Sequence, residues 1–282
     1  MTATSPVRTG TATAADGVPI AYRRWYGART GTPLVLVHGT SAHAAWWDHV
    51  VAMLPDRFDV VAVDLAGHGD SGRRADYGLD SWSSDVLAAV HDLFGDEPAV
   101  LVGHSVGGLV VAGSAVLDPA ASAGTVLVDC IVVDPVPGAV PEWRPPRAER
   151  VFGSLEEVVG RFRLTPPQPQ ADPDVLRALA VGSVRAVDGG WAWKVDPLIF
   201  GVVGKPGMCA RLPALPGPVV IVRGELSALV PPSAGADLAA QLGRQVPQFD
   251  VPGAHHHLMI DHPAELGAHL SRALDAVSPE AP

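Results

Sequence analysis

The sequence predicts an α/β fold in which a mostly parallel central sheet carries helices on both faces. Short, continuously apolar runs recur along the chain, and such runs are typical of strands buried on both faces. They alternate with longer segments of helical period, as in repeated βαβ units. This alternation is interrupted once, by a long proline-rich segment, and then resumes. We therefore expect one α/β core with an inserted segment.

Length and composition agree with this prediction. The chain of 282 residues can bury a large core, and 48% of it is hydrophobic. No apolar stretch approaches the roughly 18 residues of a membrane span, and the first sixteen residues lack the features of a secretory signal, which favours a cytoplasmic location. A net charge of −10 with no basic cluster argues against nucleic acid or an anionic membrane as partner. Two cysteines are too few for a disulfide framework, and oligomeric state is left open.

Residues 1–14 are predicted to form a disordered tail, and the core to occupy residues 15–133 and 213–282. The elements expected in its first part are strands at 20–25, 33–39, 58–64, around 100–104 and at 126–129, with helices at 44–54, 79–94 and 109–115. In its second part they are strands at 218–224 and 248–251, with helices at 232–242 and 263–277.

Residues 134–212 are predicted to form a lid inserted into the core. Prolines interrupt two helical stretches there, near 147–162 and 173–187. Trp143, Trp191 and Trp193 belong to this segment. They are expected either to line an apolar substrate pocket or to attach the lid to the core.

The segment Gly103–Gly107 has the pattern G-x-S-x-G between a strand-like run and a helix-like run. This spacing produces a sharp turn that raises one side chain above the carboxyl edge of a parallel sheet. Ser105 lies at the apex of that turn and is the predicted nucleophile. A serine hydroxyl needs a base to accept its proton as it attacks.

Four ordered signals together resemble the α/β-hydrolase superfamily over nearly the whole chain. They are His38-Gly39 after the first buried strand, Asp-x-x-Gly-x-Gly-x-Ser at 64–71, the pentapeptide around Ser105, and Gly-x-x-His at 253–256 before the last helix. The resemblance implies an α/β-hydrolase fold with a helical lid. It also implies that the base lies in the loop after the last strand. His256 is the best match to the family's histidine, and the adjacent His255 and His257 are the alternatives if the match is shifted by one residue.

The resemblance implies a carboxylate that orients the histidine. Family members usually carry it shortly after the strand at 218–224, but Ser227 stands at that position. Some members place it instead at the end of the strand after the nucleophile helix, where this chain has Asp129. Asp129 is therefore the predicted acid and Glu225 the alternative.

The same resemblance assigns the oxyanion to two backbone N–H groups, those of Thr40 and Val106. Asp64, Asp70 and Ser71 are expected to brace the site structurally. Because successive side chains diverge and no other ligand cluster completes the set, the three consecutive histidines are not expected to bind a metal. No cofactor is expected.

These residues predict a serine hydrolase that cleaves a carboxylic ester, lactone or thioester of a hydrophobic small molecule through an acyl-enzyme. The lid favours an apolar acyl or alcohol group over a charged one. Two alternatives stay open: hydrolysis of a carbon–carbon bond by the same residues, and a non-hydrolytic lyase, cyclase or ligand-binding protein on the same scaffold.

Overall fold

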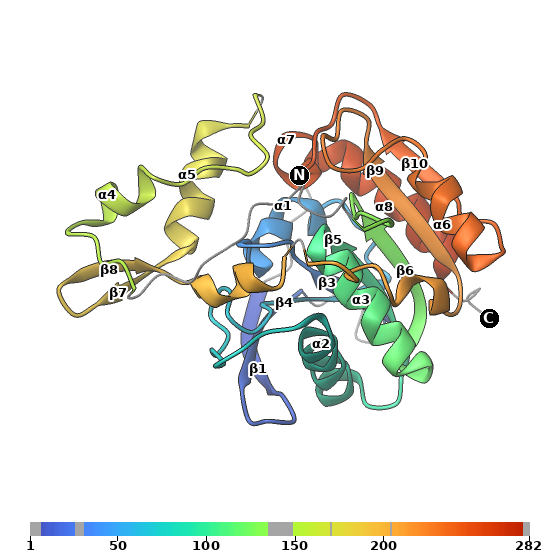
Figure 1. The fold of residues 1–282 in the computed structure, drawn as a ribbon, viewed down its shortest axis with the longest axis horizontal. Helices are drawn as coiled ribbons and strands as arrows, with labels where there is room; N and C mark the ends of the chain where they lie inside the picture. Colours follow the sequence, from blue (N-terminus) through green and yellow to red (C-terminus); the bar gives the residue numbers. More distant parts are fainter. Residues whose placement is uncertain (1–6, 26–30, 135–148, 170, 204, 279–282) are drawn as a thin grey trace.

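The protein is built on a sheet of eight strands with helices packed around it (Figure 1). The computed structural model describes residues 7–25, 31–134, 149–169, 171–203 and 205–278. The spatial order is β1-β2-β4-β3-β5-β6-β9-β10. Their bounds are β1 Val7–Thr13, β2 Pro19–Trp25, β3 Thr32–Val37, β4 Phe58–Val63, β5 Ala99–His104, β6 Ser122–Val128, β9 Val219–Gly224 and β10 Gln248–Val251. Pairs β1/β2 and β2/β4 are antiparallel and the other neighbours are parallel, which confirms the predicted fold class.

The prediction of a disordered tail over residues 1–14 was wrong for its second half. Residues 7–13 form β1, which pairs along its whole length with β2, from Val7 opposite Trp25 to Thr13 opposite Pro19. The segment is rich in Thr, Gly and Ala and has little apolar side-chain surface. Its order comes from main-chain pairing at the sheet edge, which composition does not reveal.

Alternate residues of the strands point to opposite faces of the sheet, so each face has its own hydrophobic core. Val35 and Val37 of β3 belong to one hydrophobic cluster with residues of α2 (Leu79–Phe94), α3 (Val106–Leu117) and α6 (Ala234–Leu242). Leu34 and Leu36 belong to a second cluster, which includes residues of α1 (Asp48–Val51) and α8 (Pro263–Val277). Two helical layers thus enclose the sheet (Figure 1). The helix expected at 44–54 is shorter: a 3₁₀ turn (Ala44–Trp47) leads into α1.

The segment predicted as a lid lies outside the main sheet, on the left in Figure 1. Among its described residues are α4 (Leu155–Val159), α5 (Pro173–Gly182) and an antiparallel hairpin of β7 (Val184–Val187) and β8 (Gly190–Trp193). The helix expected over 173–187 therefore ends early. Positive φ angles of 83° at Gly189 and 152° at Gly190 form the turn that returns the chain as a strand. We call this segment the cap.

Shorter elements connect these parts: 3₁₀ turns at Pro119–Ala121, Pro197–Gly201 and Leu212–Ala214, and α7 (Leu258–Asp261). In the part of the chain that the structure describes, no helix combines the length and the apolar character needed to cross a membrane.

Candidate active site

Ser105 lies between the end of β5 and the start of α3, at φ 53° and ψ −123°. A side-chain-bearing residue in this conformation carries on the order of 1–3 kcal/mol of strain, which the surrounding structure must offset. The N–H of Ser105 donates to the carbonyl of Val128 on the neighbouring strand at 2.9 Å, and that of Gly108 donates to the Ser105 carbonyl at 2.9 Å. Ser105 is half-buried and stands at the carboxyl edge of the sheet.

The glycines around Ser105 allow strand and helix to approach closely. A Cβ atom at Gly103 would lie 2.1 Å from the carbonyl oxygen of Gly107, and one at Gly107 would lie 2.5 Å from that of His38. Both contacts are with backbone, so no side-chain movement would relieve them. The turn therefore requires glycine at both positions.

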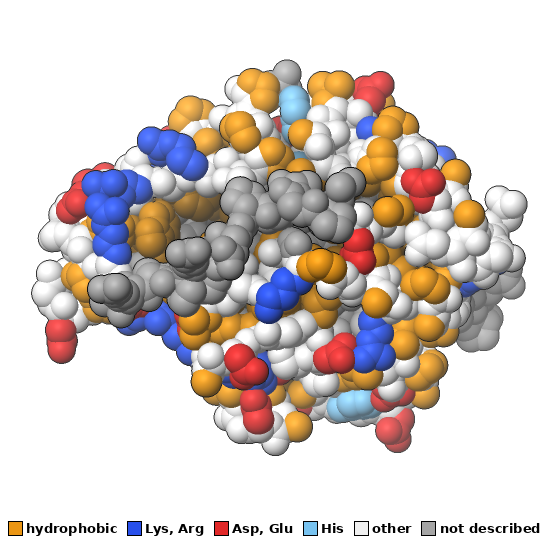
Figure 2. Space-filling view, viewed as in Figure 1, with side chains coloured by type: hydrophobic (Ala, Val, Ile, Leu, Met, Phe, Trp, Pro, Cys, Tyr) orange, Lys and Arg blue, Asp and Glu red, His pale blue; other side chains and the backbone are white. Residues whose placement is uncertain are grey.

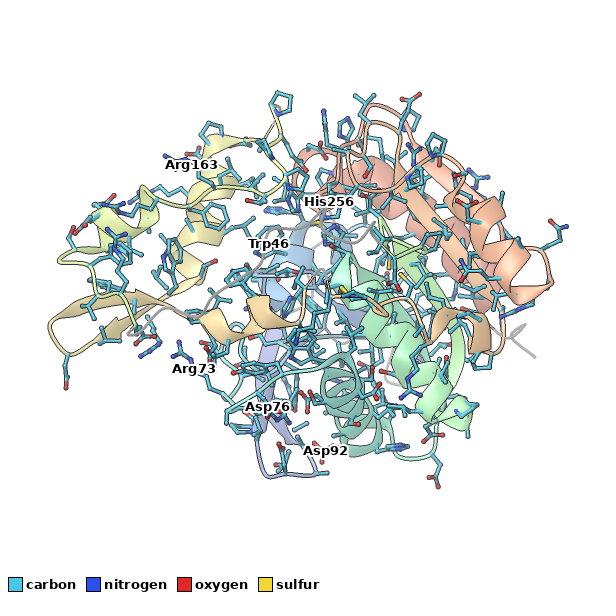
Figure 3. All side chains as sticks on the ribbon, in the orientation of Figure 1. Trp46, Arg73, Asp76, Asp92, Arg163 and His256 are labelled. Atoms are coloured by element: carbon cyan, nitrogen blue, oxygen red, sulfur yellow. The ribbon has the colours of Figure 1, made fainter. Side chains whose placement is uncertain are left out.

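His256 and Asp129, which are 127 residues apart in the chain, form a hydrogen-bonded pair. Nδ1 of His256 donates to Oδ2 of Asp129 at 2.6 Å, and both side chains are buried. Figure 3 places His256 at the carboxyl side of the sheet, on the loop before α7. Asp129 follows β6 with a positive φ of 42°, which turns its carboxylate away from the strand direction. The geometry brings the predicted base and the predicted acid together.

Two further donors hold the Asp129 carboxylate. Its Oδ1 accepts from the N–H of Gly224 at 2.9 Å, and its Oδ2 accepts from the hydroxyl of Ser227 at 2.6 Å. Ser227 Oγ in turn accepts from the N–H groups of Val230 at 3.1 Å and Leu229 at 3.3 Å, so its proton is free to point at the carboxylate. Ser227, which occupies the position where the family usually carries its acid, thus contacts the predicted acid Asp129.

The side chain of Glu225 binds a backbone N–H group. This side chain is exposed, and its Oε2 accepts from the N–H of Gly253 at 2.8 Å, bracing the loop that leads to the histidines. The geometry therefore favours Asp129 over Glu225 as the partner of His256.

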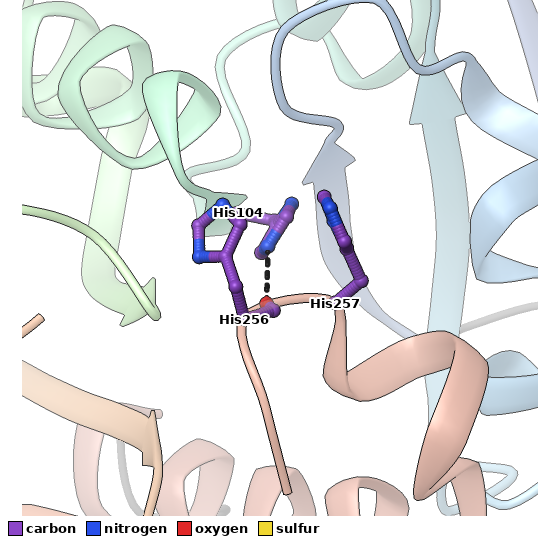
Figure 4. A group of neighbouring side chains, drawn as sticks. All are labelled: His104, His256 and His257. Atoms are coloured by element: carbon purple, nitrogen blue, oxygen red, sulfur yellow. Dashed lines mark hydrogen bonds between the residues drawn. The ribbon is translucent and has the colours of Figure 1, made fainter. Parts of the chain in front are cut away.

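His104, His256 and His257 are buried side by side, with one nitrogen of each within 4.8 Å of the others (Figure 4). His104 Nε2 donates to the carbonyl of His256 at 2.9 Å, which fixes the backbone of the predicted base. Burial lowers the pKa of His257 to about 3 and that of His104 well below its usual value, so both are neutral. His255 is not part of this cluster, because its Nδ1 lies 3.1 Å from Oδ2 of Asp261.

This cluster differs from the three consecutive histidines considered in the sequence, because His104 replaces His255. A tetrahedral zinc site brings its ligand nitrogens to about 3.3 Å of one another. The three rings would have to move closer to share an ion. Within this cluster, the hydrogen bond from His104 to the carbonyl of His256 positions the backbone of His256.

The predicted oxyanion loop lies against Ser105. A Cβ added at Gly39, next to Thr40, would be 3.1 Å from the Cβ of Ser105. On the other side, Val106 begins α3, whose N-terminal N–H groups and dipole favour negative charge. The loop that carries Thr40 and the start of α3 at Val106 therefore both lie next to Ser105.

His38 anchors this loop. Its Nδ1 donates to the carbonyl of Gly39 at 2.7 Å, and its Nε2 accepts from the N–H of Leu65 at 3.1 Å. Burial lowers the pKa of His38 to about 4, so the ring is neutral and can bridge the two loops in this way.

Hydrogen bonds of Asp64 and Ser71 tie neighbouring loops together, as expected for structural residues. Asp64 accepts from the N–H groups of Ala44 at 2.6 Å and Asp70 at 2.9 Å. Ser71 donates to the Asp64 carbonyl at 2.6 Å and accepts from the N–H of Ala21 at 2.8 Å.

A cavity of about 540 Å³ lies between the cap and the core. Its wall on the core side includes Ser41 and Ala42, which follow Thr40 in the predicted oxyanion loop, and it has the size of a small-molecule site. Its apolar wall includes Phe152, Phe162, Trp193 and Phe200.

Of the three tryptophans predicted for the pocket, Trp193 lines this cavity. Trp191 packs against the small hydrophobic core of the cap and exchanges backbone hydrogen bonds with Phe152 at 2.8 and 2.9 Å. It is not part of the cavity wall, because that pairing holds it within the cap. Trp143 lies outside the described residues.

Sequence reasoning missed the three phenylalanines, and it did not assign roles to His38 and Ser227. A lone Phe carries no positional signal in a proline-rich segment. The His-Gly pair that contains His38 and the departure at Ser227 were visible, but their contacts depend on loops far apart in the chain.

A family model described as the alpha/beta hydrolase family matches residues 34–268. The chain belongs to this family. The match spans the nucleophile turn, the intervening cap and the late histidines, so it covers all the residues assigned above.

Relatives from curated proteins agree with membership. The chain is 27% identical over 238 residues to 2-(acetamidomethylene)succinate hydrolase of Mesorhizobium japonicum, covering 81% of this chain and 83% of that protein. It is 28% identical over 256 residues to an esterase of Mycobacterium tuberculosis, covering 86% and 82%.

Solved structures show the same fold. That of E-2-(acetamidomethylene)succinate hydrolase superposes with a TM-score of 0.77 at 22% identity, covering 96% of this chain and all of the other. The thioesterase domain from the curacin biosynthetic pathway gives 0.76 at 21% identity, covering 94% and 99%.

Proposed function

We propose that this α/β hydrolase is a serine hydrolase that cleaves a carboxylic ester, lactone or thioester through an acyl-enzyme. The observation that carries the proposal is the 2.6 Å hydrogen bond from His256 Nδ1 to buried Asp129. It fixes the tautomer in which Nε2 is unprotonated and able to accept a proton. The esterase among the relatives supports the bond class.

In the proposed reaction, Ser105 Oγ attacks the substrate carbonyl carbon while its proton passes to Nε2 of His256. Asp129 stabilises the imidazolium that forms. The backbone N–H groups of Thr40 and Val106 receive the developing oxyanion. Collapse of the tetrahedral intermediate breaks the bond to the leaving alcohol or thiol, which takes the proton from His256.

Deacylation repeats these steps with water. His256 accepts a proton from the water as it attacks the acyl carbon, and returns that proton to Ser105 Oγ as the acid leaves. The apolar cavity wall beside Ser41 and Ala42 supports a substrate with a substantial hydrophobic part.

The experiment is turnover of p-nitrophenyl butyrate together with labelling by a serine-directed phosphonate, located by mass spectrometry. We expect one label, on Ser105, and loss of both label and turnover in Ser105→Ala. Folded protein that stays unlabelled, or is labelled elsewhere, would overturn the proposal. Labelling at Ser105 without hydrolysis of any ester or thioester would favour another bond class, such as carbon–carbon cleavage.

A further inference from the structure

The cavity between cap and core is positively charged, although the chain as a whole has a net charge of −10. Its charged lining residues are Glu149, Arg150, Arg161, Arg163 and Lys194. Figure 2 shows basic groups on this side of the molecule next to a hollowed hydrophobic area. The wall of this cavity thus carries positive charge, although the protein as a whole is negatively charged.

The guanidinium groups are held against the aromatic wall. Cζ of Arg150 lies 4.8 Å, and that of Arg161 5.5 Å, from the ring centroid of Phe152. Arg163 Nη1 donates to the carbonyls of Gly160 at 2.9 Å and Phe162 at 2.6 Å, which anchors its side chain on the cap (Figure 3). Cationic and apolar surfaces are therefore combined in one wall.

Several of these charges are already neutralised. Glu149 pairs with Arg73 and Arg185 outside the cavity wall, at 3.0 and 2.7 Å, and Lys194 pairs with Asp70 at 2.7 Å.

The remaining arginines differ in how they are paired. Arg161 has Glu157 at 3.6 Å. Among the described residues, no carboxylate lies within ion-pair distance of Arg150 or Arg163. Both are exposed on the cavity wall, and neither has an ion-pair partner in the part of the chain that the structure describes.

We propose that the cavity selects substrates whose apolar acyl chain ends in an anionic group, such as the half-esters or half-thioesters of dicarboxylic acids. The chain would lie on Phe152, Phe162 and Trp193, and the anionic end would meet Arg150 and Arg163. A carboxylate and a phosphonate share this chemistry. The inference rests on the proposed function and revises the expectation that the substrate carries no charge.

The test compares two esters that differ only at the end of a six-carbon acyl chain, p-nitrophenyl hexanoate and mono-p-nitrophenyl adipate. We expect kcat/KM to favour the adipate ester by about tenfold, mainly through KM, and the preference to shrink as salt is raised. The double substitution Arg150→Gln/Arg163→Gln is expected to remove most of this preference, because kcat/KM should fall much further for the adipate ester than for the hexanoate ester. Arg272→Gln is the matched control, because it removes an exposed arginine packed on Phe249 of the core.

Binding is measured separately by calorimetry on Ser105→Ala with the methyl carboxylic esters of hexanoate, adipate (as its monoester) and 6-phosphonohexanoate, so that only the far end of the chain differs in charge and carboxylate is distinguished from phosphonate. Tighter binding of the adipate or phosphonate ester than of the hexanoate ester supports the proposal. Equal binding of all three, or equal kcat/KM for the two esters, overturns it. Hydrolysis of the hexanoate ester with no preference would refute this inference alone, whereas an unlabelled Ser105 would refute the proposed function.

Discussion

Asp129→Asn is predicted to lower kcat by on the order of 10⁴, equivalent to about 5 kcal/mol of activation free energy. The structure indicates how. The N–H of Gly224 donates to Oδ1 of Asp129 at 2.9 Å, so the amide oxygen of the substituted side chain would stay there and its NH₂ group would face His256. His256 Nδ1 would then accept and Nε2 would carry the proton. A protonated Nε2 cannot take the proton of Ser105.

The assay is steady-state hydrolysis of p-nitrophenyl butyrate, with the rate of phosphonate labelling as a measure of Ser105 reactivity. Glu225→Gln is the matched control, because its side chain binds Gly253 rather than His256, and we expect an effect of only a few-fold. Circular dichroism and thermal unfolding check that both variants are folded. A folded Asp129→Asn within tenfold of the wild type, or a larger loss in Glu225→Gln, would refute the assignment.

Three further predictions follow from other contacts. Ser227→Ala removes the hydroxyl that donates to Asp129 at 2.6 Å, so kcat/KM for p-nitrophenyl butyrate should fall by about fivefold, as for the loss of one hydrogen bond of about 1 kcal/mol. Ser227→Thr, which keeps the hydroxyl, should restore it, and an unchanged kcat/KM in Ser227→Ala would argue against a positioning role. Gly107→Ala should lower the free energy of unfolding, measured in urea, by about 3 kcal/mol, because the Cβ atom of the alanine would lie 2.5 Å from a backbone carbonyl oxygen. Gly153→Ala is the control and should have little effect, because the nearest atom to a Cβ at that position is 3.8 Å away. Burial lowers the pKa of His38 to about 4 and that of His257 to about 3. In the unfolded chain both imidazoles have a pKa of about 6.5, so as the pH falls they become protonated there before they do in the folded protein. The free energy of unfolding should therefore decrease as the pH drops from about 6.5 to about 3. His257→Phe should make that fall shallower, and an unchanged slope in urea unfolding between pH 7 and 4 would contradict it.

Much of the fold could be predicted because its signals are local. The buried strands appear in the sequence as continuous apolar runs, and the helices at 79–94 and 263–277 were predicted with the bounds observed. The strand at 7–13 was missed because its order depends on pairing with β2. The end of the helix after Gly182 was missed because a hairpin that packs in the cap competes with it.

The sequence by itself was enough to predict the order of the four α/β-hydrolase motifs along the chain, the sharp turn at Ser105 and the loop that carries His256. These depend on spacing and on residue types that few backbone conformations allow. Only the tertiary structure distinguished Asp129 from Glu225, since both follow strands in the same sheet and the direction of each side chain depends on a turn. The same holds for the pairing of Ser227 with Asp129 and for the arginines that share a cavity with Phe152. The Ser227–Asp129 contact joins residues 98 positions apart. The arginines and Phe152 are close in the chain, but they line a cavity only because the cap packs on the core.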